Sequence, residues 1–227
     1  MSTDPPLTTT SYAILGLLAV QPFTTYEIAQ QMDRALGHFW PRARSKLYEE
    51  PKKLVAQGLA RARVEHQGRR PRTVYSISAK GRRALAAWVR TPGNGPVLEF
   101  DQLVRVFFCE HGSKADLLAT LEDARRWSIE QTLATGNISQ EYLDGDGPYP
   151  ERLPWLVLVA QFLDDFLVFV EEWAEWAAAR VADWPDDLVG APADLAVLEG
   201  QTRRFHAISA RLPSATAEPR PSAARAP

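Results

Sequence analysis

The sequence has very few of the residues that cross-link a small protein or bind a metal. It holds one cysteine, Cys109, which excludes an intrachain disulfide and a multi-thiolate metal site. Because Phe107 and Phe108 precede it, we interpret Cys109 as a small buried hydrophobe. No pair of histidines has the spacing of a helical metal site; they are His38, His66, His111 and His206. We therefore expect no metal, no cofactor and a reduced, cytoplasmic setting.

Catalytic and targeting patterns are missing as well. There is no nucleophile elbow, phosphate-binding loop or dinucleotide fingerprint. The acidic pairs Asp164-Asp165 and Glu171-Glu172 are better explained by a solvated helix face than by paired catalytic carboxylates. Residues 1–10 lack the basic start and cleavage site of a signal peptide. The apolar run at residues 12–20 is shorter than the roughly 20 residues of a membrane span. We expect neither catalysis nor a membrane partner.

The two halves of the chain carry opposite net charges: acidic residues are few in the first half, and basic residues are outnumbered in the second. Residues 1–91 carry fifteen Lys/Arg and six Asp/Glu, a net charge of +9, whereas residues 92–227 carry a net charge of −11. Such asymmetry favours a polyanionic partner for the first half. Chance segregation of solvated charges is the alternative, so the positions of the basic residues must decide.

Periodicity in the first half predicts three helices, a hairpin and a fourth helix. The first helix covers residues 11–20; the second opens at the capping-box spacing Thr24 to Glu27 and ends near Gly37. The third covers about residues 42–57 and closes at Gly58. Strands at 60–66 and 73–78 are joined by the loop 67–72, and Ser78 caps a helix running to about residue 90. This order is that of a winged helix-turn-helix (HTH).

The second half is predicted to be all α, after a Pro/Gly-rich break at residues 91–96. Helices are expected at about 100–110, 113–135 with an Asp116 cap, 154–183 and 193–212. Residues 213–227 lack an apolar period, and we interpret them as a disordered tail. The expected fold class is thus mainly α: a winged HTH DNA-binding domain (1–91), an all-α dimerisation and effector domain (92–212) and the tail (213–227).

The third helix has an apolar stripe and a basic face. Leu47, Tyr48, Pro51, Leu54 and Val55 share the stripe, and Glu49 lies among the residues of the opposite face. Basic and hydroxyl side chains on such a helix can contact guanine edges or phosphates in the major groove. Pro51 removes the hydrogen bond to the Leu47 carbonyl and predicts a kink or two segments. The DNA contacts expected around this helix are Arg42, Arg44, Ser45, Lys46, Tyr48, Lys52 and Lys53, together with Thr24, Thr25 and Tyr26 at the start of the second helix.

The hairpin loop concentrates positive charge. Arg69, Arg70 and Arg72 lie on a loop with no acidic neighbour, shaped by Gly68 and Pro71. A fold does not need such a cluster, whereas a wing that lies along phosphates or in a minor groove does. Together with the third helix, the loop favours duplex DNA as the partner over a merely solvated charged face.

The long helix predicted at 154–183 carries an aromatic heptad seam. The residues of this seam recur at alternating steps of four and three. Such an apolar seam must be buried, either within the domain or against a partner copy. We favour a homodimer, and a small aromatic effector bound in the same region is a further hypothesis. The seam consists of Trp155, Val159, Phe162, Phe166, Phe169, Trp173 and Trp176.

These patterns resemble the start of PadR-type regulators. The resemblance is carried by residues 7–18 (LTTTSYAILGLL), 25–28 (TYEI), 39–41 (FWP), 45–48 (SKLY), 54–59 and 72–78 (RTVYSIS), and by Gly81. It is strong over about residues 7–90 and weaker beyond, where residues 103–108 are similar. Two positions depart from the family: Pro51 replaces a helix former, and Arg44 stands where an aromatic is common.

The resemblance implies a dimeric repressor that binds a pseudo-palindromic operator through the third helix and the wing. It also implies dimerisation through the C-terminal helices and, in some members, release of DNA on binding phenolic or other hydrophobic molecules. Two alternatives stay open: a winged-helix module whose basic face meets an acidic protein, and a small-molecule-binding protein or enzyme built on the aromatic C-terminal helices.

Overall fold

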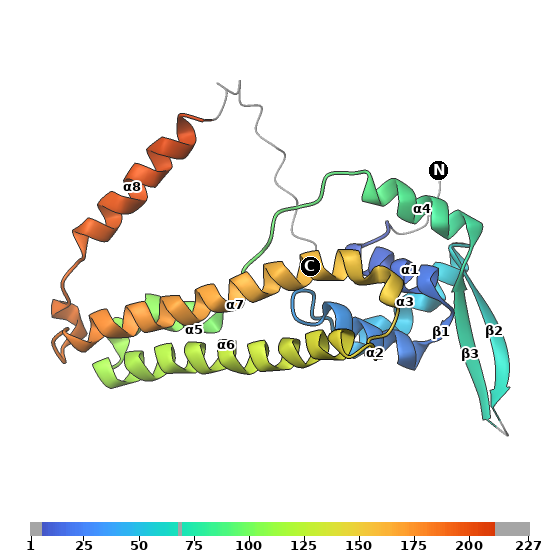
Figure 1. The fold of residues 1–227 in the computed structure, drawn as a ribbon, viewed down its shortest axis with the longest axis horizontal. Coiled ribbons are helices and arrows are strands. Elements are labelled where there is room, and N and C mark those ends of the chain that lie inside the picture. The colour runs from blue at the N-terminus through green and yellow to red at the C-terminus, as the bar shows by residue number, and fades with distance from the viewer. Residues whose placement is uncertain (1–5, 68–69, 212–227) are drawn as a thin grey trace. The chain divides into compact units, whose positions relative to one another are not determined.

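The computed structural model describes residues 6–67 and 70–211, and its elements are traced in Figure 1. The chain divides into two compact units. The first unit holds the residues up to Glu99 together with Ile138–Phe166, and the second holds Phe100–Asn137 together with the residues from Leu167 onward. Each unit is described by itself. The predicted disordered tail, 213–227, lies outside the described residues.

The first helix of unit 1, α1 (Thr9–Val20), begins with a hydrogen-bonded cap. The Thr8 hydroxyl accepts from the Ser11 N–H at 3.2 Å, and the Ser11 hydroxyl accepts from the Thr8 N–H at 2.9 Å. This reciprocal pair satisfies N–H groups that a helix start otherwise leaves unbonded. The helix therefore begins two residues earlier than its apolar period indicates.

The second helix, α2 (Thr25–Leu36), confirms the predicted capping box. The Thr24 hydroxyl accepts from the Glu27 N–H at 3.3 Å, and the Glu27 carboxylate accepts from the Thr24 N–H at 2.6 Å. Just before the helix, Phe23–Thr24 forms a two-residue strand, β1, that pairs with a later strand. Sequence patterning did not indicate this strand because two residues show no alternation.

The third helix, α3 (Arg44–Ala56), is continuous through Pro51 and is not divided into two segments. The Pro51 ring is among the most buried side chains of the unit, so it contributes to packing while it withholds one backbone donor. Gly58 follows with a φ of +70°, a left-handed conformation that suits glycine at a helix end. The predicted closure of this helix at Gly58 is confirmed.

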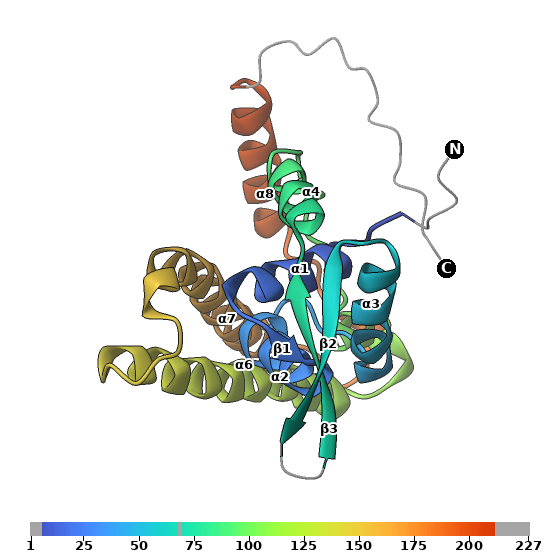
Figure 2. The ribbon, with the colours of Figure 1, turned by 90° about the vertical axis from the view of Figure 1, so that its right-hand side faces the viewer.

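Two longer strands complete an antiparallel sheet in the order β1-β3-β2. They are β2 (Ala60–Gln67) and β3 (Arg70–Ile77), and Figure 2 shows them as a long hairpin with α3 beside β2. The prediction of a six-residue loop at 67–72 is wrong, since pairing continues to Gln67 opposite Arg70. Cross-strand pairing extends the ladder through a basic segment that has no apolar alternation of its own.

Helices α1 to α4 and the three-stranded sheet, residues 9–89, form the winged region. Its last helix, α4 (Ala79–Val89), has the predicted Ser78 cap. The Ser78 hydroxyl accepts from the Gly81 N–H at 3.0 Å and donates to the Gly58 carbonyl at 2.7 Å. A Cβ at Gly81 would lie 2.1 Å from the Leu59 carbonyl oxygen, so this close approach requires glycine. The cap therefore ties α4 to the turn after α3.

The core of the winged region gathers the apolar faces of its helices around the sheet. Ile14, Leu15, Ile28 and Leu54 have no exposed surface, and Leu47 almost none. Burial of apolar area stabilises a fold by about 25 cal/mol per Å², so this core contributes a large share of the driving force for folding of the region. The same core fixes which face of α3 remains at the surface.

Between residues 101 and 209 every regular element is a helix. These helices are α5 (Asp101–Phe107), η1 (Cys109–His111), α6 (Lys114–Leu143), η2 (Pro150–Arg152), α7 (Leu153–Ala182), η3 (Leu188–Gly190) and α8 (Leu195–Ser209). The predicted Asp116 cap of α6 is confirmed, with the Ser113 N–H donating to its carboxylate at 2.9 Å. The helix runs past the predicted end at Thr135 because a single interior glycine, Gly136, costs only about 1 kcal/mol.

Unit 2 has a small core where α6 and α7 meet. Leu117, Leu121, Val181 and Leu188 are buried there. Lys114 donates from Nζ to the carbonyls of Ala182 and Trp184, both at 2.7 Å, which satisfies acceptors that the end of α7 leaves unbonded. The predicted all-α character of the C-terminal region is therefore confirmed.

Candidate nucleic-acid interface

The surface of α3 carries the expected basic face. Leu47, Pro51 and Leu54 face the core, which leaves the opposite side of the helix in solvent. Ser45 and Lys46, in the N-terminal turns, lie on this exposed side and are therefore available to a groove of duplex DNA. The exposed residues are Ser45, Lys46, Glu49, Lys52 and Lys53. Arg44 begins the helix.

Arg42 lies before α3 rather than within it. Its guanidinium stacks 4.0 Å from the centre of the Trp40 ring, and Nη1 donates to the Pro41 carbonyl at 2.7 Å. A cation held over an aromatic face loses part of its side-chain freedom. Arg42 is therefore a basic group fixed at the entrance to α3, and it would reach DNA from the preceding turn.

The placement of Tyr48 on the buried stripe is wrong. Its side chain is 39% exposed, whereas the adjacent Leu47 is 1% exposed. Successive residues are turned by about 100° on a helix, and this turn moves Tyr48 past the edge of the buried face. The exposure agrees with its other predicted role as a DNA-contacting residue.

The three residues expected to contact DNA at the start of α2 differ in their availability. Thr24 uses its hydroxyl in the capping box, and Thr25 is half-buried. Tyr26 is exposed, and its hydroxyl accepts from Gln30 Nε2 at 3.3 Å. The first helix of an HTH pair crosses the phosphate backbone, and Tyr26 is the member of this group with most surface to offer it.

The wing contains an acidic residue at the centre of its basic cluster. Glu65 lies directly opposite Arg72 in the β2–β3 register and accepts hydrogen bonds from Arg63 and Arg72. These two guanidinium groups lower the pKa of Glu65 below its usual range. The prediction of a cluster without an acidic neighbour is therefore wrong: on an antiparallel hairpin, strand residues meet the residues opposite them.

Not every predicted wing residue falls within the described structure. Arg72 lies in β3 and is half-exposed along its side chain. Arg70 begins β3, whereas Arg69 lies outside the described residues. Sequence reasoning missed Arg63 and Glu65; their spacing of two, which places both on one face of a strand, was the available signal.

Comparison with known proteins agrees with this geometry. Residues 14–87 match the model of the transcriptional regulator PadR-like family. The expectation drawn from the motifs is thus confirmed for this stretch, which we call the PadR-like region. The family consists of transcriptional regulators rather than enzymes, in agreement with the prediction that the chain is not an enzyme.

Two curated relatives match the chain over a similar stretch. A probable transcriptional regulator of Mycobacterium tuberculosis is 35% identical over 82 residues, which are 36% of this chain and 43% of the relative. The negative transcriptional regulator PadR of Bacillus subtilis is 34% identical over 79 residues, which are 34% of this chain and 43% of that protein. The chain spans less than half the length of either relative.

Solved structures extend the likeness of fold beyond the PadR-like region. Bacillus subtilis PadR in complex with operator DNA has a TM-score of 0.69 at 22% identity, covering 78% of this chain and 99% of that one. A protein of Streptococcus mutans has a TM-score of 0.66 at 21% identity, covering 76% and 99%. The predicted winged HTH with a helical C-terminal region is therefore confirmed as the fold.

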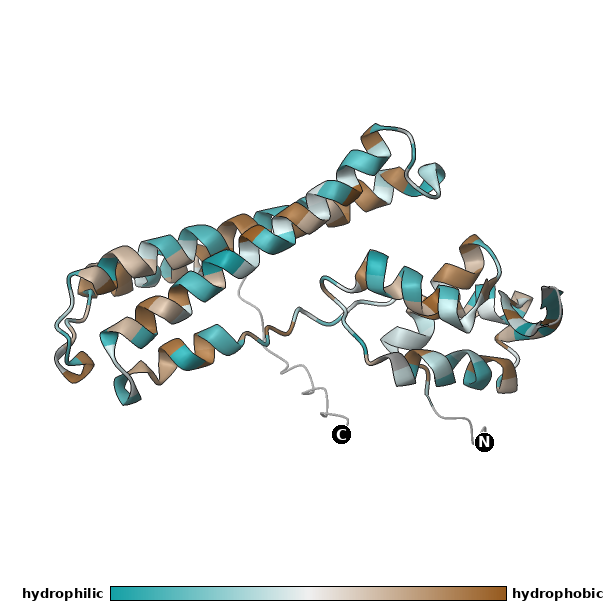
Figure 3. Cartoon of the chain, turned by 90° about the horizontal axis from the view of Figure 1, so that it is seen from below, coloured by the Kyte–Doolittle hydropathy of each residue, from teal (hydrophilic) through white to brown (hydrophobic). Residues whose placement is uncertain are grey.

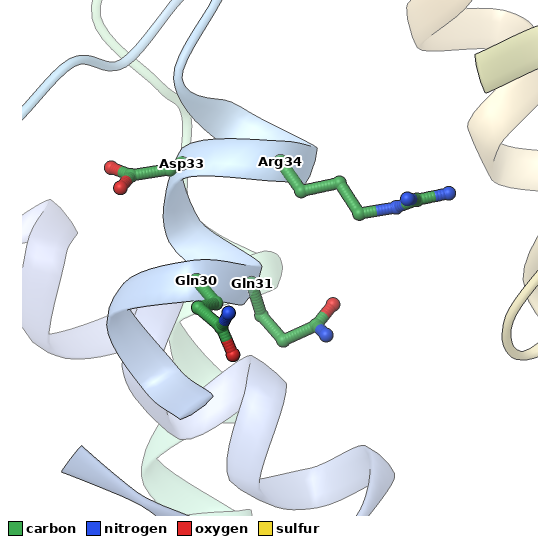
Figure 4. A pocket seen from close by; sticks show the side chains of 4 residues that line it. All are labelled: Gln30, Gln31, Asp33 and Arg34. Atoms are coloured by element: carbon green, nitrogen blue, oxygen red, sulfur yellow. The ribbon is translucent and has the colours of Figure 1, made fainter. Parts of the chain in front are cut away.

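A shallow hollow lies beside α2 in the PadR-like region. It measures ≈ 570 Å³, is wide open to solvent and is lined by Gln30, Gln31, Asp33 and Arg34. In Figure 4, Gln31 and Arg34 point to one side of α2 while Asp33 points to the other. Arg34 forms an ion pair with Glu141. Sites for aromatic ligands are mostly apolar and enclosed, so this hollow lacks the lining that the predicted effector would need.

The predicted heptad seam on α7 is largely at the surface of the single chain. Phe162 and Phe169 are 62% and 61% exposed. Trp155, Val159 and Trp176 are also exposed, whereas Phe166 and Trp173 are half-buried. In Figure 3, hydrophobic residues interrupt the hydrophilic ones along the long C-terminal helices. An apolar surface of this size on a monomer marks an interaction site.

Composition allows one further interpretation of the same helix. Among the residues that the structure describes, the helical stretch Pro150–Ala182 is long and apolar enough to cross a membrane. A helix that buries its face in a protein interface has the same length and composition. The acidic side chains Asp164 and Asp165 near its middle would be expensive in hydrocarbon, which favours the protein interface.

Proposed function

We propose that this chain is a homodimeric, sequence-specific, DNA-binding transcriptional repressor of the cytoplasm. Two recognition helices, one from each copy, would enter successive major grooves of a pseudo-palindromic operator, about 34 Å apart, and the wings would lie on the flanking backbone. Steric exclusion of the transcription machinery would then repress the gene. DNA contact is assigned to residues 1–91, and dimerisation and effector binding to residues 92–212.

The observation that carries the proposal is the exposed basic face of α3 in the PadR-like region. Ser45 and Lys46 occupy its first turns, where side chains of a recognition helix meet base edges. Lys52 and Lys53 extend the same face toward phosphates. The Bacillus subtilis PadR structure with operator DNA and the description of that protein as a negative regulator support both the partner and the sign of regulation.

Self-association is supported by the exposed seam of α7. Each Phe or Trp buried in an interface removes 150–250 Å² of surface from water. The five exposed seam residues from each of two copies would therefore supply much of the apolar area of a standard specific interface. A two-fold dimer also presents the two DNA-binding regions with the symmetry of a palindromic operator.

An effector of aromatic or hydrophobic character is supported by a related structure. Bacillus subtilis PadR has been solved in complex with p-coumaric acid, at 21% identity and a TM-score of 0.63. The aromatic side chains Phe100, Trp127 and Trp173 cluster in unit 2, with ring centres 6.1 and 6.2 Å apart. We place the effector among such aromatic residues of the C-terminal region, and its binding would lower the affinity for DNA.

The experiment compares three variants of the full chain with the unaltered protein by fluorescence anisotropy on labelled duplexes at fixed salt. Lys46→Ala should change the preference among sequences, whereas Arg69→Ala with Arg70→Ala should weaken binding to every duplex. Arg204→Ala, which removes an exposed basic side chain of α8 far from the PadR-like region in sequence, is the control and should match the unaltered protein. If the double wing variant binds every duplex normally, the wing assignment is wrong.

A further inference from the structure

A polar contact links α1 to α3, the proposed recognition helix. Ser11 Oγ donates a hydrogen bond to Glu50 Oε1 at 2.5 Å. Ser11 is 1% exposed, and the Glu50 side chain is 15% exposed. Hydrogen bonds to a carboxylate are roughly twice as strong as bonds between neutral groups, and shelter from water strengthens them further.

The cap of α1 sets the direction of this bond. Ser11 Oγ already accepts from the Thr8 N–H at 2.9 Å and lies 3.0 Å from the Thr8 hydroxyl. An ionised carboxylate cannot donate, so the single hydroxyl proton of Ser11 goes to Glu50. Thr8 Oγ1 then donates to Ser11. The chain Thr8 to Ser11 to Glu50 therefore runs in one direction, from the cap of α1 to the middle of α3.

Glu50 occupies the border between the two faces of α3. Its carboxylate lies 3.7 Å from Lys53 Nζ, and Lys53 belongs to the basic face. The neighbouring Glu49, by contrast, is exposed in the middle of that face. The partly buried Glu50 side chain has a hydroxyl donor on one side and a lysine on the other, and these two contacts hold it in place. The exposed Glu49 can instead move away from an approaching phosphate.

We propose that Glu50 is a positioning residue: its bond to Ser11 fixes the rotation of α3 about its own axis and so determines which bases the helix meets. The proposal rests on the proposed DNA-binding function and adds a specificity-determining pair to it. Rotation or sliding of α3 would move the Glu50 carboxylate off the Ser11 hydroxyl. A base-edge contact tolerates far less displacement than a phosphate contact, because direct readout depends on paired donors and acceptors.

A second hydrogen bond from the N-terminal turn of α1 also helps to hold α3 in position. Trp40 Nε1, in the turn before α3, donates to Thr10 Oγ1 at 3.4 Å. The N-terminal turn of α1 thus holds both the approach to α3 and its middle. The Ser11–Glu50 bond is the shorter of the two, and it alone carries a charge, so it is the one whose loss should be measurable.

The test is a double-mutant cycle on the full chain with Ser11→Ala, Glu50→Ala and the double variant. The readout is discrimination: the dissociation constant for random duplex divided by that for the duplex that the unaltered protein selects. Each single variant should lose about fivefold in discrimination, and the double variant should lose no more, since both changes break the same bond. Glu50→Gln keeps an oxygen acceptor for Ser11 and should restore discrimination.

Two controls separate positioning from general stability. Thr8→Ala weakens the cap of α1 without removing the Ser11–Glu50 bond, and it should lower the unfolding midpoint while leaving discrimination unchanged. Glu49→Ala removes an exposed charge from the same helix and should combine additively with Ser11→Ala. Additive losses in the Ser11–Glu50 cycle, or an equal loss of discrimination in Thr8→Ala, would overturn the proposal. If the unaltered protein selects no duplex at all, the proposed function itself fails.

Discussion

Glu65 and Arg72 lie directly opposite each other in the antiparallel β2–β3 pair, and Arg72 Nη2 donates to Glu65 Oε2 at 3.2 Å. Arg63 donates to the other oxygen of the same carboxylate. The wing therefore carries an internal anion that, in the proposed DNA-binding function, would compete with phosphate for two of its guanidinium groups. This arrangement would limit the strength of sequence-independent binding.

Removal of that anion should strengthen binding to any duplex. In Glu65→Gln, Arg63 and Arg72 no longer face the Glu65 charge, and each guanidinium that then reaches a phosphate adds about 0.9 to the slope of log affinity against log salt. The measurement is a salt titration on random duplex. Glu99→Gln removes an exposed charge outside the wing and is the matched control. An unchanged slope in Glu65→Gln would show that the wing does not contact phosphates.

The interaction of Glu65 with Arg63 and Arg72 should make the stability of the wing depend on pH. Hydrogen bonds from Arg63 and Arg72 lower the pKa of Glu65 from its ordinary 4.5. Because the pKa of Glu65 is lower in the folded state, its ionised carboxylate stabilises the fold fully at pH values above its ordinary pKa. This stabilisation is lost as the pH falls through the lower, folded-state pKa. The difference in unfolding free energy between the unaltered protein and Glu65→Gln should thus be constant near neutrality and shrink below pH 4.5. A difference that is the same at pH 3 and pH 7 would contradict this assignment.

Sequence patterns located the elements because caps and buried stripes leave local signals. Thr24, Glu27, Ser78 and Gly58 each mark a helix end by a residue type that the end requires. The sequence patterns did not reveal which strand segments pair with each other. β1 is two residues long, and the extension of the hairpin to Gln67 depends on pairing with a distant segment rather than on alternation within the strand.

The candidate site was predictable on α3 and less so on the wing. Lys46, Lys52 and Lys53 follow from helical spacing alone. The relationship of Glu65 to Arg72 follows only from the strand register, which fixes the residues that face each other. Glu50 is similar: its spacing places it at the border of the basic face, and only the packing of α1 on α3 brings Ser11 to its carboxylate.

The capping box of α2 should contribute measurably to stability. Thr24→Ala removes the acceptor for the Glu27 N–H and should lower the free energy of unfolding by about 1 kcal/mol. Chemical denaturation measures the change. Thr25→Ala, one residue further on, is the control and should cost less because that side chain makes no cap. If Thr24→Ala and Thr25→Ala cost the same, the cap is not a significant source of stability.

Charge on the exposed seam of α7 should dissociate the dimer without unfolding the chain. Phe162→Glu and Phe169→Glu each place a carboxylate on a surface that is mostly exposed in the single chain, and burying it at an interface would cost several kcal/mol. Sedimentation velocity should show monomers with unchanged helical circular dichroism. Gln161→Glu, beside the seam, should remain dimeric. Dimers in both phenylalanine variants would place the interface elsewhere.

The most direct test is selection of bound duplexes from a random DNA pool, with competitor DNA at physiological salt. A dimeric PadR-like regulator should enrich a two-fold symmetric motif whose half-sites lie about one helical turn apart, with centres about 34 Å from each other. A folded, dimeric protein that enriches no motif would contradict sequence-specific DNA binding, and the basic face of α3 would then have to serve an acidic protein partner.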